Sequence, residues 1–343
     1  MKKRANILLL YTGGTIGMVK DYESGALKAF DFDELINNIP EITQLDCDLN
    51  GISFKTPIDS SNMNPLYWSK IAVLIEKNYD AFDGFVILHG SDTMSYSASA
   101  LSFMLEDLSK PIIFTGSQLP IGDLRTDAKE NLITSIQIAS LLRNGVSVIQ
   151  EVCLYFEYKL YRANRTTKIS AEHFEAFASP NYPPLAEAGV HLNISEQLLL
   201  KRSEHSSKLM VHKTMSNQVG VLKLFPGLSK SFLKAVLQAP DLKALVLETY
   251  GAGNAPLEEW FLNEIDSAIK KGIHIINVTQ CSGGSVAMGH YETSEKLLAL
   301  GLVNGKNLTT EAAITKAMFL LGNKIFNSDF KKVFETSLRG EMN

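Results

Sequence analysis

The clearest structural signal in this sequence is NILLLYTGGTIG, at residues 6–17. Its first half is a short apolar run that ends in glycines, which is typical of a buried strand in a parallel sheet. Gly13 and Gly14 allow the chain to turn sharply after this strand and bring backbone amides close to a ligand. We therefore expect the hydroxyl of Thr15 at the mouth of a sheet.

Strand-like and helix-like segments alternate along the chain. Short runs rich in branched and aromatic residues occupy 6–12, 84–89, 111–115 and 147–156, and amphipathic stretches occupy 65–82, 93–108 and 128–144. This alternation predicts a parallel sheet with helices on both faces, and a ligand site beyond the carboxyl ends of the strands.

A second α/β unit follows a change in composition after Ala178, where turn formers and then a polar run at 201–208 indicate a linker. Beyond it, predicted strands at 219–225, 244–250 and 274–279 alternate with helices at 229–238 and 257–271. We predict two α/β domains with mainly parallel sheets: a larger N-terminal domain at 1–190, a linker at 191–213 and a smaller C-terminal domain at 214–343.

Composition indicates a soluble globular protein, with 45% hydrophobic and 20% charged residues among 343. The net charge of -4 argues against nucleic acid as a partner, and no apolar stretch has the length needed to cross a membrane. Three cysteines without a CxxC pair suit a reducing compartment. We expect a cytoplasmic protein that binds a small molecule.

Hydroxyl-rich segments follow four predicted strands. They read TGGT at 12–15, DSSN at 59–62, HGSDT at 89–93 and TGSQ at 115–118. Each segment alone is explained by helix capping. Because parallel strands place all four segments at one edge, a polar binding site is the better joint explanation.

Phosphate and metal binding are disfavoured by spacing. The glycines at 13, 14 and 17 do not match G-x-G-x-x-G, and no G-x-x-x-x-G-K-[ST] occurs. The seven histidines show no H-E-x-x-H or paired spacing, so we expect neither a metal nor another cofactor. Only His89, which adjoins the predicted site, is of interest.

A threonine nucleophile needs a nearby base and donors for the oxyanion. Ser91 and Asp92 offer a hydroxyl and a carboxylate, and Lys168 lies in a polar loop after another predicted strand. A lysine held by a carboxylate can accept a proton through a hydroxyl. A lone lysine is more often a solvated surface charge, so the role of Lys168 rests on the resemblance given next.

Together these segments resemble the bacterial-type L-asparaginases, most closely the cytoplasmic type I branch. Members of that family carry T-G-G-T-I and H-G-T-D-T segments, which match residues 12–16 and 89–93. The similarity covers nearly the whole chain and includes DSSNM at 59–63, TGSQ at 115–118, YRANRTTK at 161–168 and YGAGNAP at 250–256.

The resemblance implies hydrolysis of L-asparagine to L-aspartate and ammonia through an acyl-enzyme, with minor glutaminase activity left open. It implies attack by Thr15 and proton relay by Ser91, Asp92 and Lys168. The implied substrate-binding residues are Asp59, Ser60, Ser61, Ser91 and Asp92. No cofactor or metal is implied, and a homodimer or homotetramer is expected.

The sequence departs from the family pattern at three places. Ser91 replaces the usual threonine and loses the methyl group that restricts its rotamers. The family tyrosine near a glycine in the loop after the nucleophile is missing, because Gly25 precedes Ala26 and the nearest tyrosine is Tyr22. Some members carry a regulatory arginine just before the tyrosine of the segment that matches 250–256, whereas here Glu248 stands two residues before Tyr250, so the sequence does not support an allosteric asparagine site.

Other functions remain open from sequence alone. A non-catalytic amino-acid or nucleotide binding module would keep Asp92 and Ser60 but would not need Lys168 or a hydroxyl at Thr15. The segment CSGGS at 281–285 is a weak serine amidase motif, since such runs are usually turns. The related tRNA-dependent deamidating subunit carries an additional N-terminal domain, which is not expected here because the predicted nucleophile strand begins at residue 6.

Overall fold

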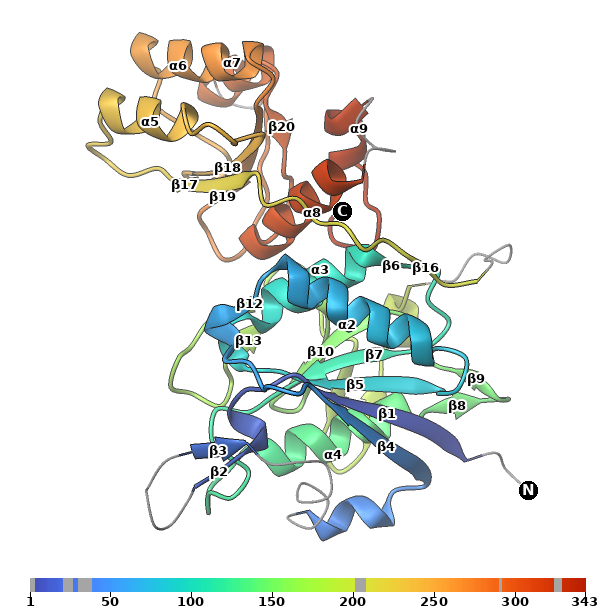
Figure 1. The fold of residues 1–343 in the computed structure, drawn as a ribbon. Coiled ribbons are helices and arrows are strands. Elements are labelled where there is room, and N and C mark those ends of the chain that lie inside the picture. The colour runs from blue at the N-terminus through green and yellow to red at the C-terminus, as the bar shows by residue number, and fades with distance from the viewer. Residues whose placement is uncertain (1–3, 21–26, 30–38, 201–207, 290–291, 324–328) are drawn as a thin grey trace. The chain divides into compact units, whose positions relative to one another are not determined.

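The computed structural model describes residues 4–20, 27–29, 39–200, 208–289, 292–323 and 329–343. The chain forms two compact units, Met1–Lys213 and Thr214–Asn343. Each is an α/β unit built on its own sheet (Figure 1). The predicted fold class, with a larger N-terminal and a smaller C-terminal α/β unit, is confirmed.

The first unit contains an eight-stranded sheet in the order β15-β14-β11-β10-β7-β5-β1-β4. The strands β10, β7, β5, β1 and β4 run parallel, and β11, β14 and β15 extend the sheet antiparallel. Their bounds are β1 Ala5–Tyr11, β4 Cys47–Ser53, β5 Gly84–Leu88, β7 Ile112–Thr115, β10 Val152–Phe156, β11 Lys159–Arg162, β14 Ala186–Ala188 and β15 Leu192–Ile194.

Helices cover both faces of this sheet. Figure 1 shows α2 (Pro65–Asn78) and α3 (Met94–Met104) on one face and α4 (Ala128–Ala139) on the other. The central strand β5 is therefore buried along its whole length, as expected of an apolar run in a parallel sheet. Short hairpins and pairs complete the unit: β2 Met18–Lys20 with β3 Leu27–Ala29, β6 Leu105–Glu106 with β16 Met210–Val211, β8 Leu142–Arg143 with β9 Val146–Ser147, and β12 Thr167–Lys168 with β13 Phe177–Ala178.

Two of the predicted segments have different bounds in the structure. The helix expected over 128–144 stops at Ala139, because Asn144 and Gly145 adopt positive φ and form the two-residue turn of the β8–β9 hairpin. The strand expected over 147–156 begins only at Val152. Its first residues belong to β9 and a connecting loop.

The segment 191–213, expected as a linker, contributes to the first unit. It contains β15, the 3₁₀ helix η6 (Glu196–Leu198) and β16. The carboxylate of Glu151 accepts from Arg162 at 2.6 Å and from the backbone N–H of Leu200 at 2.8 Å. This buried ion pair therefore holds part of the segment against the sheet.

The second unit contains a four-stranded parallel sheet in the order β17-β18-β19-β20. The strands are β17 Val219–Lys223, β18 Ala244–Thr249, β19 His274–Thr279 and β20 Val303–Asn304, and the helices are α5 Lys230–Leu237, α6 Glu259–Lys270, α7 Glu292–Ala299, α8 Thr310–Gly322 and α9 Phe330–Phe334. Figure 1 shows α5 and α6 on one face and α8 on the other. Side-chain caps fix two helix starts: Ser229 accepts from the N–H of Phe232, and Thr309 from that of Ala312.

Candidate active site

The turn after β1 is packed so tightly that only glycine fits its first two positions. Gly13 and Gly14 have φ of 134° and 88°. A Cβ atom on Gly13 would lie 2.1 Å from the carbonyl oxygen of Ile58, and one on Gly14 would lie 2.4 Å from the Cα of Gly90. The ends of β1, the loop after β4 and the end of β5 therefore meet backbone to backbone at one edge of the sheet.

Thr15 begins the 3₁₀ helix η1 (Thr15–Gly17) and is half-buried. The Tyr11 hydroxyl donates to the carbonyl oxygens of Gly14 at 3.4 Å and Gly17 at 3.1 Å. These hydrogen bonds stabilise the turn. Burial raises the pKa of Tyr11 to about 12, so this phenol remains a donor at neutral pH. Because Gly14 contacts Gly90, the segments of Thr15 and Ser91 lie next to each other.

A lysine joins this edge from a distant part of the chain. Lys168, the last residue of β12, donates from Nζ to Ser91 Oγ at 2.9 Å and to Asp92 Oδ1 at 2.7 Å. Its side chain is 18% exposed, whereas that of Asp92 is 68% exposed. The amine is therefore fixed between a hydroxyl and a carboxylate, while most of Asp92 stays open to a ligand.

The Ser91 hydroxyl has a second partner, which the sequence analysis did not assign to the site. It donates to Oε1 of Gln118 at 3.1 Å. Gln118 follows β7, the strand beside β5, so its place in TGSQ at the same sheet edge was the available signal. The hydroxyl-rich ends of β5 and β7 are thus joined through side chains.

The segment after β4 supplies the remaining predicted residues. Asp59 accepts from the backbone N–H and from the hydroxyl of Ser61, both at 2.9 Å, and these hydrogen bonds hold its pKa below the usual value. Ser60 is buried against Gly90, where an added Cβ atom would lie 2.5 Å from Ser60 Oγ. Thr93 Oγ1 also donates to the Ser60 carbonyl at 2.7 Å. The structure therefore brings Asp59, Ser60 and Ser61 to the edge that carries Ser91 and Asp92.

Two family models together match most of the chain. The one described as "Asparaginase, N-terminal" matches residues 6–200, and "Glutaminase/Asparaginase C-terminal domain" matches residues 218–334. This chain belongs to the asparaginase family. The predicted family is confirmed.

Similar proteins match nearly the whole of this chain. L-asparaginase 1 of Escherichia coli K12 is 42% identical over 342 residues, covering 99% of this chain and 98% of that protein. The 60 kDa lysophospholipase of Mus musculus is 39% identical over 373 residues, but this chain spans only 63% of its length. The crystal structure of L-asparaginase I from Vibrio cholerae has 38% identity and a TM-score of 0.89, covering 99% of this chain and 100% of that one.

His89 fixes the backbone directly before Ser91. It is fully buried, and its Nδ1 lies 2.7 Å from the carbonyl oxygen of Gly90. Burial lowers the pKa of His89 to about 4, so the ring is neutral at physiological pH. A neutral Nδ1–H donor fixes the Gly90 carbonyl, and the ring itself does not face solvent.

Two residues flagged in the sequence have different outcomes. Tyr22, with the Gly25–Ala26 step, lies outside the described residues. Glu248 lies in β18, and its carboxylate accepts from the hydroxyl of Thr310 at 2.6 Å.

Across the described residues no group of three His, Cys, Asp or Glu side chains is placed to hold a metal, and no described helix has the length and apolar character to cross a membrane.

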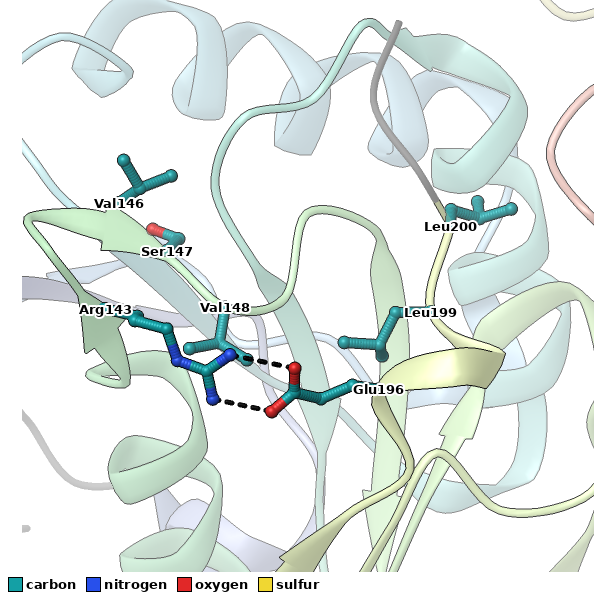
Figure 2. A pocket seen from close by; sticks show the side chains of 7 residues that line it. All are labelled: Arg143, Val146, Ser147, Val148, Glu196, Leu199 and Leu200. Carbon is teal, nitrogen blue, oxygen red and sulfur yellow. Dashed lines mark hydrogen bonds and ion pairs between the residues drawn. The ribbon is translucent and has the colours of Figure 1, made fainter.

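A separate cavity of about 310 Å³ lies elsewhere in the first unit and shares no residue with the site (Figure 2). Its lining is Arg143, Val146, Ser147, Val148, Glu196, Leu199 and Leu200. Arg143 and Glu196 form a two-pronged ion pair at 2.8 and 2.5 Å across it. The Ser147 hydroxyl donates to the Asp83 carbonyl, so this cavity presents no activated nucleophile.

Proposed function

We propose that this chain hydrolyses L-asparagine to L-aspartate and ammonia through an acyl-enzyme on Thr15. The observation that carries the proposal is the contact of Lys168 Nζ with both Ser91 and Asp92, beside the glycine turn that presents Thr15. The relatives named L-asparaginase support the choice of substrate.

In the first half-reaction the Thr15 oxygen attacks the side-chain amide carbon of asparagine. The Thr15 proton leaves as the new C–O bond forms, and it reaches the departing nitrogen when the C–N bond breaks and ammonia is released. Lys168 in its neutral form accepts a proton through the Ser91 hydroxyl, and Asp92 stabilises the ammonium that results. Water then attacks the ester, the bond from the acyl carbon to the Thr15 oxygen breaks to release aspartate, and a proton from that water passes to the Thr15 oxygen.

The oxyanion of each tetrahedral intermediate requires donors. Thr15 and Ser91 are the first residues of the 3₁₀ helices η1 and η4 (Ser91–Thr93). Backbone N–H groups at such positions lack intrahelical acceptors. They are therefore our candidates for the oxyanion hole, and the contact of Gly14 with Gly90 holds the two turns together.

Substrate selection in this proposal uses the remaining polar groups at the edge. Asp92 binds the α-ammonium with the part of its carboxylate that Lys168 leaves exposed. Ser60 and Ser61 bind the α-carboxylate. For this the Ser61 hydroxyl turns its proton from Asp59 to the ligand, while the backbone N–H of Ser61 stays on Asp59. A ligand that carries both a free amine and a free carboxylate fits this set, which favours an amino acid over a peptide.

The deciding experiment compares wild type with Thr15→Ala and Thr15→Ser by ammonia release from L-asparagine. Thr15→Ala should lose about 10³-fold or more in kcat, and Thr15→Ser should retain measurable turnover because the hydroxyl remains. Circular dichroism and an asparagine-induced rise in Tm check that Thr15→Ala is folded and binds. Wild-type turnover by Thr15→Ala would remove threonine from the mechanism. An inactive wild type that is stabilised by asparagine would favour the binding module.

L-glutamine should be measured in parallel with L-asparagine. One methylene of substrate length changes the barrier by only about 1–3 kcal/mol, so a minor glutaminase activity is compatible with this site.

We also propose a homodimer or homotetramer in the cytoplasm. The three cysteines, all among the described residues, are free, which suits a reducing compartment. Light scattering of the purified chain tests the oligomeric state.

A further inference from the structure

The side-chain amide of Gln118 has one possible orientation. Its Nε2 donates to the carbonyl oxygen of His173 at 3.1 Å. Because that carbonyl only accepts, the amide nitrogen faces His173 and the amide oxygen faces Ser91. The Ser91 hydroxyl must therefore be the donor in its 3.1 Å contact with Gln118 Oε1.

The same hydroxyl meets Lys168 on its other side. Lys168 Nζ donates to Ser91 Oγ at 2.9 Å, so the hydroxyl accepts from the amine while it donates to Gln118. Two partners of opposite hydrogen-bonding character thus fix both the position of Ser91 Oγ and the direction of its proton.

Gln118 is itself held firmly. Its backbone N–H donates to both carboxylate oxygens of Asp127, at 3.1 and 2.9 Å, and the N–H of Leu119 donates to Oδ1 at 3.2 Å. Asp127 is buried, and Asn131 Nδ2 bridges its Oδ2 to the Gly116 carbonyl. These hydrogen bonds connect the loop after β7 to the start of α4 and therefore fix the backbone of Gln118.

We propose that Gln118 is a positioning residue that selects the Ser91 rotamer with Oγ at Lys168 Nζ, and that the hydroxyl proton turns from Gln118 to the neutral amine when the relay runs. This inference deepens the proposed function and rests on it. A serine side chain has three staggered χ1 positions, whereas those of a β-branched threonine are further restricted by its methyl group. The hydrogen bond from Ser91 to Gln118 supplies the restriction that the side chain lacks.

A rotated Ser91 hydroxyl would break the path between the substrate and Lys168. Displacements of about 1 Å in a reacting group cost on the order of 10²-fold in rate. Because the proposal gives Gln118 no contact with substrate, its loss should lower kcat and leave KM nearly unchanged.

The test is a cycle of Gln118→Leu and Ser91→Thr, with asparagine as substrate. In the Ser91 background Gln118→Leu should lower kcat by about tenfold or more, with KM changed by less than about twofold. In the Ser91→Thr background the same Gln118→Leu change should cost less than about threefold, because the methyl group restricts the rotamer instead.

The matched control is Gln150→Leu. Gln150 is also half-buried and donates from Nε2 to a backbone carbonyl, that of Ser147, but it touches no residue of the site. It should leave kcat unchanged. Crystal structures of wild type and Gln118→Leu give a readout that does not depend on turnover. Ser91 Oγ should stay within hydrogen-bond distance of Lys168 Nζ in the first and occupy other rotamers in the second.

Several results would overturn the inference. Equal losses from Gln118→Leu in both backgrounds would mean general support of the loop, and a raised KM at unchanged kcat would mean a substrate contact. An unmoved Ser91 in the Gln118→Leu crystal structure would also refute it. An inactive wild type would instead count against the proposed function, and the two crystal structures would still decide the role of Gln118.

Discussion

Polar side chains lie at the carboxyl ends of the parallel strands in both sheets of this chain. The two edges differ in which of these side chains are exposed to a ligand. In the first unit, the edge beyond β1, β5 and β7 presents Thr15, Ser91 and Asp92 together with the amine of Lys168. In the second unit, the edge beyond β18 and β19 also carries threonine, asparagine and glycine. Its threonine and asparagine side chains, however, form hydrogen bonds within the strands and loops of that unit.

The second edge shows this in its hydrogen bonds. Thr249 Oγ1 donates to Asn277 Oδ1 at 2.6 Å, and Asn277 Nδ2 donates to the Gly253 carbonyl at 3.1 Å. Thr279 Oγ1 donates to the Gly251 carbonyl at 2.6 Å. Thr249 and Asn277 are fully buried. Polar residues after a parallel strand therefore indicate a site only when a charged group joins them and part of the set stays exposed.

Removing the amine from the first edge should have the largest effect. Lys168→Met keeps the length of the side chain and removes the proton acceptor, so kcat for asparagine should fall by about 10³-fold. The control is Lys159→Met, which removes an exposed lysine whose ion pair with Glu175 lies outside the site. If kcat of Lys168→Met stays within about tenfold of wild type, the amine of Lys168 is not what distinguishes the first edge from the second.

The sequence predicted the strands β1, β5, β7, β17, β18 and β19, and β10 with an earlier start, because apolar periodicity follows burial directly. It did not predict β4, β11, β14, β15 or β20. It also predicted that the segments 12–15, 59–62, 89–93 and 115–118 share an edge, since parallel strands leave no other arrangement. The contact of Lys168 with Asp92 spans 76 positions and was expected only through the family resemblance.

What the sequence did not predict depends on side-chain geometry and local turns. The sequence predicts a helix that ends at Asn144, although an Asn-Gly dipeptide favours the hairpin turn found at Asn144 and Gly145. The role of Gln118 depends on Asp127, nine positions later, which fixes the loop so that the amide reaches Ser91. Such a contact arises from rotamers and loop anchoring, which leave no periodic pattern.

Disturbing the second edge should lower stability and leave catalysis intact. Thr249→Val removes the donor to Asn277 Oδ1 and leaves that buried oxygen without this partner, which should cost about 1–3 kcal/mol in the free energy of unfolding. Thr249→Ser keeps the hydroxyl and should cost less. Denaturant unfolding measures the difference, and kcat measured well below Tm should match wild type. A loss of kcat in folded Thr249→Val would show that this edge takes part in the reaction.

The smallest effect is expected at Cys281, the most nucleophilic residue type on the second edge. It is exposed, and its backbone N–H donates to Thr279 Oγ1 at 3.0 Å. The nearby Ser285 hydroxyl donates to the Val286 carbonyl at 3.5 Å, so its proton is held by the backbone rather than by a base. Cys281→Ala should keep kcat within about twofold of wild type.

Alkylation provides a second view of the same thiol without changing the sequence. Burial raises the pKa of Cys47 to about 11 and also raises that of Cys153, so iodoacetamide at neutral pH should modify Cys281 before either of them. Mass spectrometry should find one adduct on wild type and none on Cys281→Ala, with asparagine turnover preserved in both. Inactivation that tracks the Cys281 adduct would place a reactive group on the second edge after all, and the distinction between the two edges would then have to rest on Lys168 alone.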